Sequence, residues 1–305
     1  MKSYCVGVDI LKCIACFGVT ALHFGRNVQW FAVAVPVFMF ISTYLCGRLF
    51  SEGSWQELLL RLRRLYVPFI AWGMIYFAVL MVYEHTFNWR ILLTQLLLGT
   101  PACPVLYFIA LLASFSIILY LSGHCHCRQA LMVAIFCLCI ALQYSGLNAM
   151  LFDGMQFDVK MVLGRFLELL PAAILGYGYY LHESRMHNKY IVMLFVGLAI
   201  FYFYCVAVNL PLGCSGFSYQ GVPILLGTLG IGGVMLSINY KVGAFVHQMA
   251  TLTAGIYYTH LLVGKLLEMK IGKQRGWLES IAVFCLAACV VAVMKRIRWL
   301  RELVR

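Results

Sequence analysis

Three ionisable residues in one apolar stretch have the types and spacing for proton chemistry. Asp9, Lys12 and His23 interrupt the otherwise apolar run 5–25. At 100° per residue, a helix would place Lys12 and His23 within roughly 20° of each other and about 16 Å apart along its axis, with Asp9 on the same side. Because an imidazole can accept a hydroxyl proton near neutral pH, His23 is a candidate general base on a polar passage.

A structural interpretation of the same residues stays open. Asp9 and Lys12 stand at positions i and i+3, so they can neutralise each other on one helix face. His23 would then lie at the level of the lipid head groups. The spacing alone does not decide between ion pairing and a passage.

The composition shows which kind of element must hold these residues. Of the 305 residues, 63% are hydrophobic and 11% are charged, whereas a typical soluble domain has roughly 25% charged residues. This excludes an ordinary soluble enzyme. About ten apolar runs approach the roughly 20 residues that cross a bilayer core, and the run 91–99 is too short to do so. We predict an all-α membrane protein, a polytopic bundle of about ten transmembrane helices forming one domain over 1–305.

The distribution of cations predicts how the chain is oriented in the membrane. It does not indicate a nucleic-acid partner. The net charge is +12, but Lys and Arg cluster between apolar runs and form no basic face with interleaved aromatic residues. More of them fall on one side of the predicted bundle, which favours cytoplasmic termini and suits a bacterial inner membrane. The predicted loop 265–275 opposes this bias with four cations, Lys265, Lys270, Lys273 and Arg275.

Two further patterns have structural interpretations. The run His124-Cys125-His126-Cys127 contains zinc-ligand types, but adjacent ligands on a short loop cannot all converge on one tetrahedral ion, so we expect no metal site. The glycines at 227, 230, 232 and 233 suit close helix contacts in lipid.

The segment from Val8 to Lys12, followed after ten residues by His23, resembles the opening helix of the acyltransferase-3 family of membrane O-acyltransferases. That helix typically carries an Asp, then an Arg and, ten residues later, a His. Lys12 stands at the Arg position, where it keeps the charge but lacks the two-pronged guanidinium.

Other segments continue the resemblance in the same order. Residues 35–42 are similar to the family's second helix, 61–68 to its basic approach to the third, and 106–112 to a later segment. Residues 255–260 are similar to its late motif from Tyr to His. The order and spacing of these pieces over nearly the whole chain, more than any single piece, support the resemblance.

The resemblance implies an activity and roles for individual residues. It implies transfer of an acyl group, which we predict to be acetyl, from acyl-CoA to a hydroxyl of a cell-envelope glycan or lipid-linked sugar. The co-substrate would be acetyl-CoA, and the bilayer would surround the protein. The implied catalytic residues are His23, Lys12 and Asp9; the implied CoA-phosphate ligands are Arg61 and Arg64; the implied acceptor-binding residues are His260 and Tyr257.

Competing interpretations remain for the basic cluster and for the whole chain. Cations at 61, 63 and 64 also suit a cytoplasmic helix end beside anionic lipid. A transporter of a small polar substrate would equally use charged groups within its spans, although the chain shows no clear internal repeat. A sensor or anchor with the same fold is a third class. Dependence on acyl-CoA separates the enzyme from both.

Overall fold

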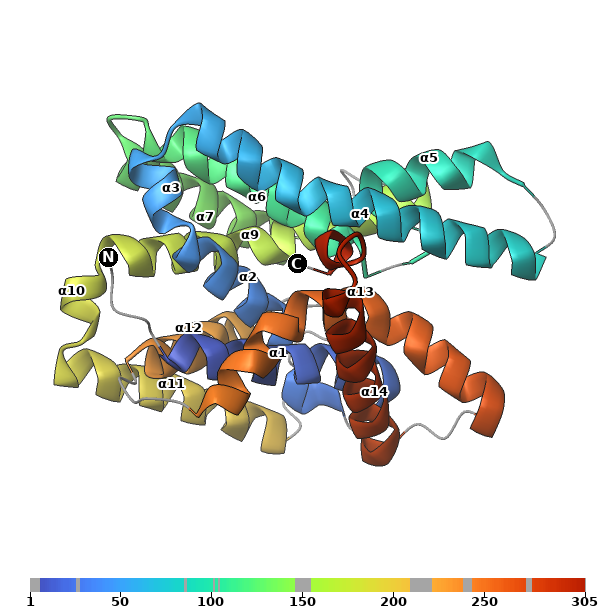
Figure 1. The fold of residues 1–305 in the computed structure, drawn as a ribbon. Coiled ribbons are helices and arrows are strands. Elements are labelled where there is room, and N and C mark those ends of the chain that lie inside the picture. The colour runs from blue at the N-terminus through green and yellow to red at the C-terminus, as the bar shows by residue number, and fades with distance from the viewer. Residues whose placement is uncertain are drawn as a thin grey trace. The chain divides into compact units, whose positions relative to one another are not determined.

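The computed structural model describes residues 6–25, 28–84, 87–100, 102–103, 105–145, 155–208, 221–237, 243–272 and 276–304. Within these ranges the regular elements are α-helices and short 3₁₀ helices, and no strand occurs (Figure 1). This confirms the predicted all-α class. The chain divides into two compact units, Met1–Ile41 with Gly178–Arg305 and Ser42–Tyr177. The single domain over 1–305 stays a prediction.

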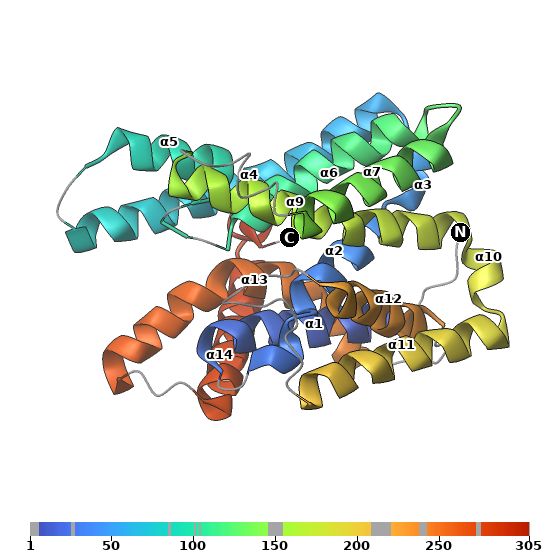
Figure 2. The same cartoon turned by 180° about the vertical axis from the view of Figure 1, so that it is seen from behind.

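The first unit is built around its N-terminal helix. α1 contacts α12, α13 and α14, which come from the other end of the sequence, and the two views show it among them (Figures 1 and 2). The elements of this unit are α1 (Val6–Phe24), η1 (Val28–Phe31), the first part of α2 (Ala34–Leu45), α10 (Glu183–Met186), α11 (Lys189–Ala207), α12 (Val222–Leu236), α13 (Ala244–Ile271), α14 (Trp277–Arg296) and η2 (Arg301–Leu303).

Glycines allow α11 and α12 to approach each other closely. A Cβ added to Gly230 would lie 2.5 Å from the backbone nitrogen of Ala199, and one added to Gly227 would lie 2.6 Å from the ring of Tyr202. Atoms at such distances overlap, so only glycine fits this contact. The predicted role of the glycine run in helix packing is confirmed.

The second unit centres on α4 and α6. α4 contacts α5 and α6, and α6 also contacts α3 and α7. The elements are the last part of α2, α3 (Gly47–Glu52), α4 (Trp55–Glu84), α5 (Trp89–Leu98), α6 (Tyr107–Gly123), α7 (Arg128–Tyr144) and most of α9 (Phe157–Leu181).

α4 begins well before the apolar run that marks it in the sequence. The backbone N–H of Ser54 donates to the Glu57 carboxylate (2.9 Å), and the backbone N–H of Glu57 donates to the Ser54 hydroxyl (3.3 Å). This reciprocal capping box starts the helix, so Arg61 and Arg64 stand one turn apart within α4.

α5 has ten residues, is capped by Asn88, and ends at Gly99 with φ of 77°. It is therefore too short to span a bilayer, as predicted for the run 91–99.

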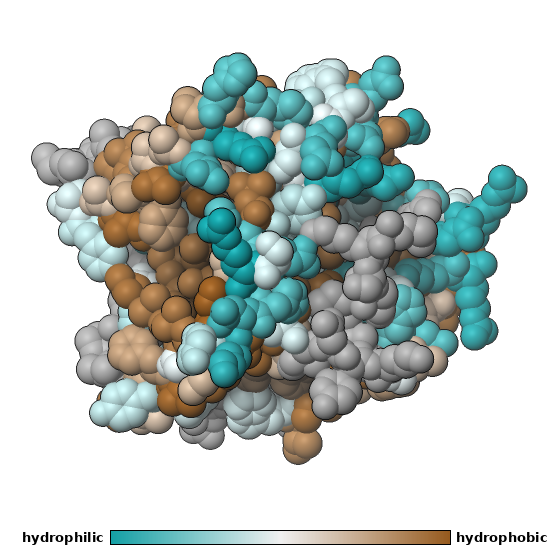
Figure 3. Space-filling model, turned by 90° about the vertical axis from the view of Figure 1, so that its left-hand side faces the viewer, coloured by the Kyte–Doolittle hydropathy of each residue, from teal (hydrophilic) through white to brown (hydrophobic). Residues whose placement is uncertain are grey.

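Among the described residues, four helices, α1, α4, α11 and α14, are long and apolar enough to cross a membrane. On the face drawn in Figure 3, strongly hydrophobic side chains reach the surface in a continuous area, with hydrophilic ones gathered beside it. This pattern fits a chain surrounded by lipid. The predicted count of about ten spans stays a prediction.

One predicted loop is wrong in part. α13 continues to Ile271, so residues 265–271 of the expected loop are helical, and residues 273–275 lie outside the described residues. Lys265 and Glu268, one turn apart, pair at 3.1 Å and stabilise this part of the helix.

Candidate active site

α1 and α13 run side by side in the same direction. Three pairs of residues show this, because their numbers rise together: Asp9 meets His247, Cys16 meets Thr253, and His23 meets His260. Parallel packing brings one face of α1, with its three predicted catalytic residues, against one face of α13. The polar contacts at the two ends of this interface are fourteen residues apart on α1, or about 21 Å.

His23 and His260 form the contact near the C-terminal end of α1. Their ring centroids are 5.4 Å apart, with an angle of 44° between the ring planes. His23 is half-buried and His260 is 1% exposed. The sequence identifies both residues, and the structure brings them together although they are distant in the chain.

The hydrogen bonds of His260 define its tautomer. Its Nδ1 lies 2.8 Å from the carbonyl oxygen of Tyr257 and 3.2 Å from that of Ile256. Because a carbonyl only accepts, Nδ1 carries the proton, and in the neutral ring Nε2 holds the lone pair. This Nε2 is buried and has no hydrogen-bond partner among the described residues. It is therefore available to a hydroxyl proton or to an N–H group.

Tyr257 belongs to the same cluster. Its ring lies 5.9 Å from that of His260 and 6.4 Å from that of Phe38 on α2, measured between centroids. The hydroxyl of Thr259, two residues further along, donates instead to the carbonyl of Gly255 (2.9 Å) within its own helix. The Tyr257 ring is therefore in contact with the histidine. Its role in acceptor binding stays a prediction.

Asp9 and Lys12 lie at the other end of the α1–α13 interface. The Lys12 Nζ is 3.8 Å from Asp9 Oδ1, and the other carboxylate oxygen lies 2.8 Å from His247 Nδ1. The predicted pairing of Asp9 with Lys12 is therefore present. The structure does not bring these two residues to His23, because about 21 Å of helix separates Asp9 from it.

Arg61 and Arg64 belong to the second unit, where both line a cavity of about 390 Å³ together with Cys46, Leu49, Glu57, Leu60 and Leu65. The Nε–H of Arg61 donates to the Ser116 hydroxyl (3.0 Å), which fixes the guanidinium. Its Nη2 is buried without a hydrogen-bond partner among the described residues. A fixed guanidinium with an unused donor suits an anionic ligand such as phosphate.

Glu57 supplies the carboxylate in the lining of this cavity. It is 3.2 Å from the guanidinium of Arg48. Its charge is therefore partly neutralised.

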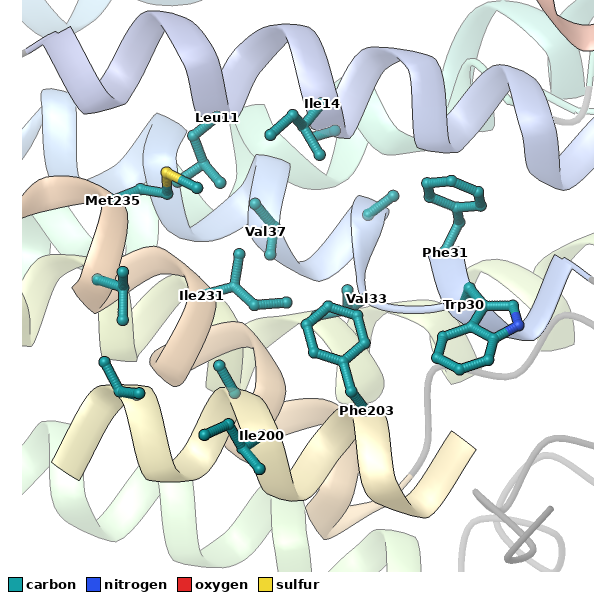
Figure 4. Close-up of a pocket in the computed structure, with 15 residues that line it drawn as sticks. Leu11, Ile14, Trp30, Phe31, Val33, Val37, Ile200, Phe203, Ile231 and Met235 are labelled. Carbon is teal, nitrogen blue, oxygen red and sulfur yellow. The ribbon is translucent and has the colours of Figure 1, made fainter. Parts of the chain in front are cut away.

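A second cavity lies in the first unit, and its chemistry differs. It has a volume of about 440 Å³ and is lined by fifteen residues, all apolar, from α1, η1, α2, α11, α12 and the turn between η1 and α2. Leu11 and Ile14 reach it from α1, and Phe203 reaches it from α11 (Figure 4). At 100° per residue these two α1 positions lie on a different side of the helix from Lys12 and His23. The lining offers no group for proton transfer.

Two polar residues of the first unit were missed by sequence reasoning, His247 and Glu279. Glu279 is 6% exposed, and both carboxylate oxygens lack hydrogen-bond partners among the described residues. It stands in the first turn of α14, which meets the end of α1 through a bond from the Gly276 N–H to the Phe24 carbonyl (3.0 Å). Its sequence signal was an acidic residue at the start of an apolar run, a place where charge is costly.

The acyltransferase-3 family model, described as an acyltransferase domain, matches residues 6–296. The chain belongs to this family. No similar curated protein and no similar solved structure was found. The match covers both units and contains all of the predicted site residues, so the protein is a membrane acyltransferase. The expected family is confirmed, and an acyltransferase is favoured over a transporter.

Proposed function

We propose that this acyltransferase moves an acetyl group from acetyl-CoA to a hydroxyl of a cell-envelope glycan or lipid-linked sugar, and that the transfer occurs beside His23 and His260. The observation that carries the proposal is the buried Nε2 of His260, which faces no hydrogen-bond partner among the described residues and belongs to a ring 5.4 Å from that of His23. A buried acceptor without a partner is costly, so its persistence suits a group that acts on a substrate.

The two imidazoles supply the proton chemistry that O-acylation needs. One ring takes the proton of the acceptor hydroxyl while the oxygen attacks the thioester carbonyl. The carbon–sulfur bond then breaks, and the CoA sulfur leaves as a thiol after receiving a proton. His23 is the proposed general base. His260, with Tyr257, holds the acceptor hydroxyl or orients His23 through its Nε2.

The donor would be bound through its phosphates and its reactive arm. In the second unit, Arg61 and Arg64 line one cavity, and guanidinium groups suit phosphate geometry. Lys12 supplies a positive charge on α1, and Asp9 positions that charge. Both termini would lie on the cytoplasmic side of a bacterial inner membrane, because the distribution of cations favours this orientation. Acetyl-CoA is available on that side.

The test is acyl-CoA dependence in membranes that contain the protein and a candidate acceptor. Labelled acetyl-CoA should place base-labile label in the glycan or glycolipid fraction, and labelled free acetate should not. Labelled succinyl-CoA in a parallel reaction defines the donor. Label from succinyl-CoA alone would replace acetyl by succinyl. Absence of label from every acyl-CoA, with protein and acceptor both confirmed, would contradict the proposal.

A further inference from the structure

His247 stands in the first turn of α13, against the N-terminal end of the polar face of α1. Its Nδ1 lies 2.8 Å from Asp9 Oδ2. Because an ionised carboxylate can only accept, Nδ1 carries the hydrogen of this bond. The His247 side chain is 55% exposed, whereas that of Asp9 is 5% exposed. An accessible imidazole thus serves as a hydrogen-bond donor to a buried carboxylate.

The two carboxylate oxygens of Asp9 have partners on two different helices. One oxygen accepts from His247 on α13, and the other lies 3.8 Å from the Nζ of Lys12 on α1. The longer distance shows a loose ion pair, and the Lys12 side chain keeps 29% of its surface exposed. Burying a carboxylate is costly unless hydrogen bonds compensate. Of these two partners of the Asp9 carboxylate, the Lys12 ammonium would be the one that remains without His247.

His247 lies too far from the histidine pair to act on the acceptor. It meets α1 at Asp9, and fourteen residues of helix, about 21 Å, separate that contact from His23. The contact through which His247 can influence transfer is its hydrogen bond to Asp9, and through Asp9 the Lys12 ammonium. His247 is therefore a candidate positioning residue.

We propose that His247 holds Asp9 by its Nδ1–H and so keeps the Lys12 ammonium in a loose pair, available to the acyl donor. The assignment of Lys12 to the donor rests on the proposed function; the arrangement of the three side chains does not. When His247 is removed, Asp9 turns to Lys12, the pair tightens, and the ammonium is withdrawn. The expected kinetic result is a higher KM for acyl-CoA with a smaller change in kcat.

Two substitutions distinguish the effect of losing the hydrogen bond from the effect of losing the ring. In His247→Asn the amide nitrogen is the same number of bonds from Cβ as Nδ1, so the donor to Asp9 is kept. In His247→Gln the amide lies one bond further out, so the donor is displaced. Gln248→Ala, at the next and exposed position, is a matched control.

The experiment measures the reactivity of Lys12 toward an amine-specific reagent, by mass spectrometry of the purified full-length protein. A tighter ion pair protects an amine, so His247→Ala and His247→Gln should lower Lys12 labelling severalfold. His247→Asn and Gln248→Ala should match the wild type. In an Asp9→Asn background, His247→Ala should cause no further change. A parallel assay of acyl transfer should show a raised KM for acyl-CoA in the Ala and Gln variants.

The outcomes separate this proposal from the proposed function. Equal Lys12 labelling in wild type and a folded His247→Ala protein would overturn the role of His247. If the Ala variant does not fold, equal Lys12 labelling in the His247→Asn and His247→Gln variants would overturn the role of His247. A wild type that transfers no acyl group would contradict the proposed function, whereas the labelling would still test the arrangement of His247, Asp9 and Lys12.

Discussion

At the scale of single residues, the tautomer of His260 decides what the histidine pair can do. Backbone carbonyls of its own helix occupy Nδ1–H, so the buried Nε2 is the atom that can meet a substrate or His23. A histidine held in this way is already oriented before the acceptor arrives. Orientation of this kind lowers the entropy that the reaction must lose.

His260→Ala should therefore lower kcat by about 10²- to 10⁴-fold, the usual range for loss of acid–base assistance. His187→Ala is the control, because His187 is an exposed histidine outside the site. Steady-state transfer by purified, monodisperse variants provides the measurement. Wild-type kcat in His260→Ala would remove this residue from the proton chemistry.

Part of the site could be predicted from the residues themselves. The spacing of Asp9, Lys12 and His23 placed all three on one side of a helix, and the resemblance added His260. The contact of His247 with Asp9 could not be predicted, because it joins residues 238 positions apart and depends on the register between two helices. Glu279 had a signal, as an acidic residue at the start of an apolar run, but the sequence alone does not show that its carboxylate is buried.

At the scale of elements, local sequence accounts for helix ends better than hydropathy does. The resemblance made residues 61–68 the approach to a helix, but the capping box of Ser54 and Glu57 begins α4 at Trp55. Similarly, α13 continues beyond its apolar run, where Lys265 and Glu268 pair. Charged side chains at helix ends can therefore be part of the helix.

The close packing of α11 and α12 gives a prediction about stability. Gly230→Ala should destabilise the protein by about 1–3 kcal/mol, because the added Cβ would overlap the backbone of α11, which cannot move aside. Gly197→Ala is the matched control, since a Cβ there has nothing within 4 Å. Thermal unfolding in detergent measures both. Equal melting temperatures for the two variants would contradict this account of the interface.

The cavity on α4 gives a prediction about donor binding. Arg61→Ala should raise the KM for acyl-CoA by about tenfold or more, because a hydrogen bond to a charged group contributes about 1.5–3 kcal/mol. Arg63→Ala removes the same charge from an exposed position outside the lining of this cavity, and it should change KM little. Inhibition by free CoA provides an independent measure. Similar losses in the two variants would indicate a general effect of charge.

At the scale of the whole molecule, the composition indicated a membrane protein, and the family match indicated an acyltransferase. A chain with 63% hydrophobic residues was predicted to lie in a membrane, and its four long apolar helices agree. Hydropathy alone gave no reason to prefer an enzyme to a transporter. Motifs spread over the chain gave that reason, because their order and spacing match those of the acyltransferase-3 family.

Transfer of labelled acetyl from acetyl-CoA to envelope glycan is the most direct test of the central claim, with wild type, His23→Ala and His187→Ala compared in membranes at equal protein levels. We predict label with the wild type and His187→Ala and none above background with His23→Ala. Full transfer by His23→Ala would contradict the assignment of the active site to the α1–α13 interface.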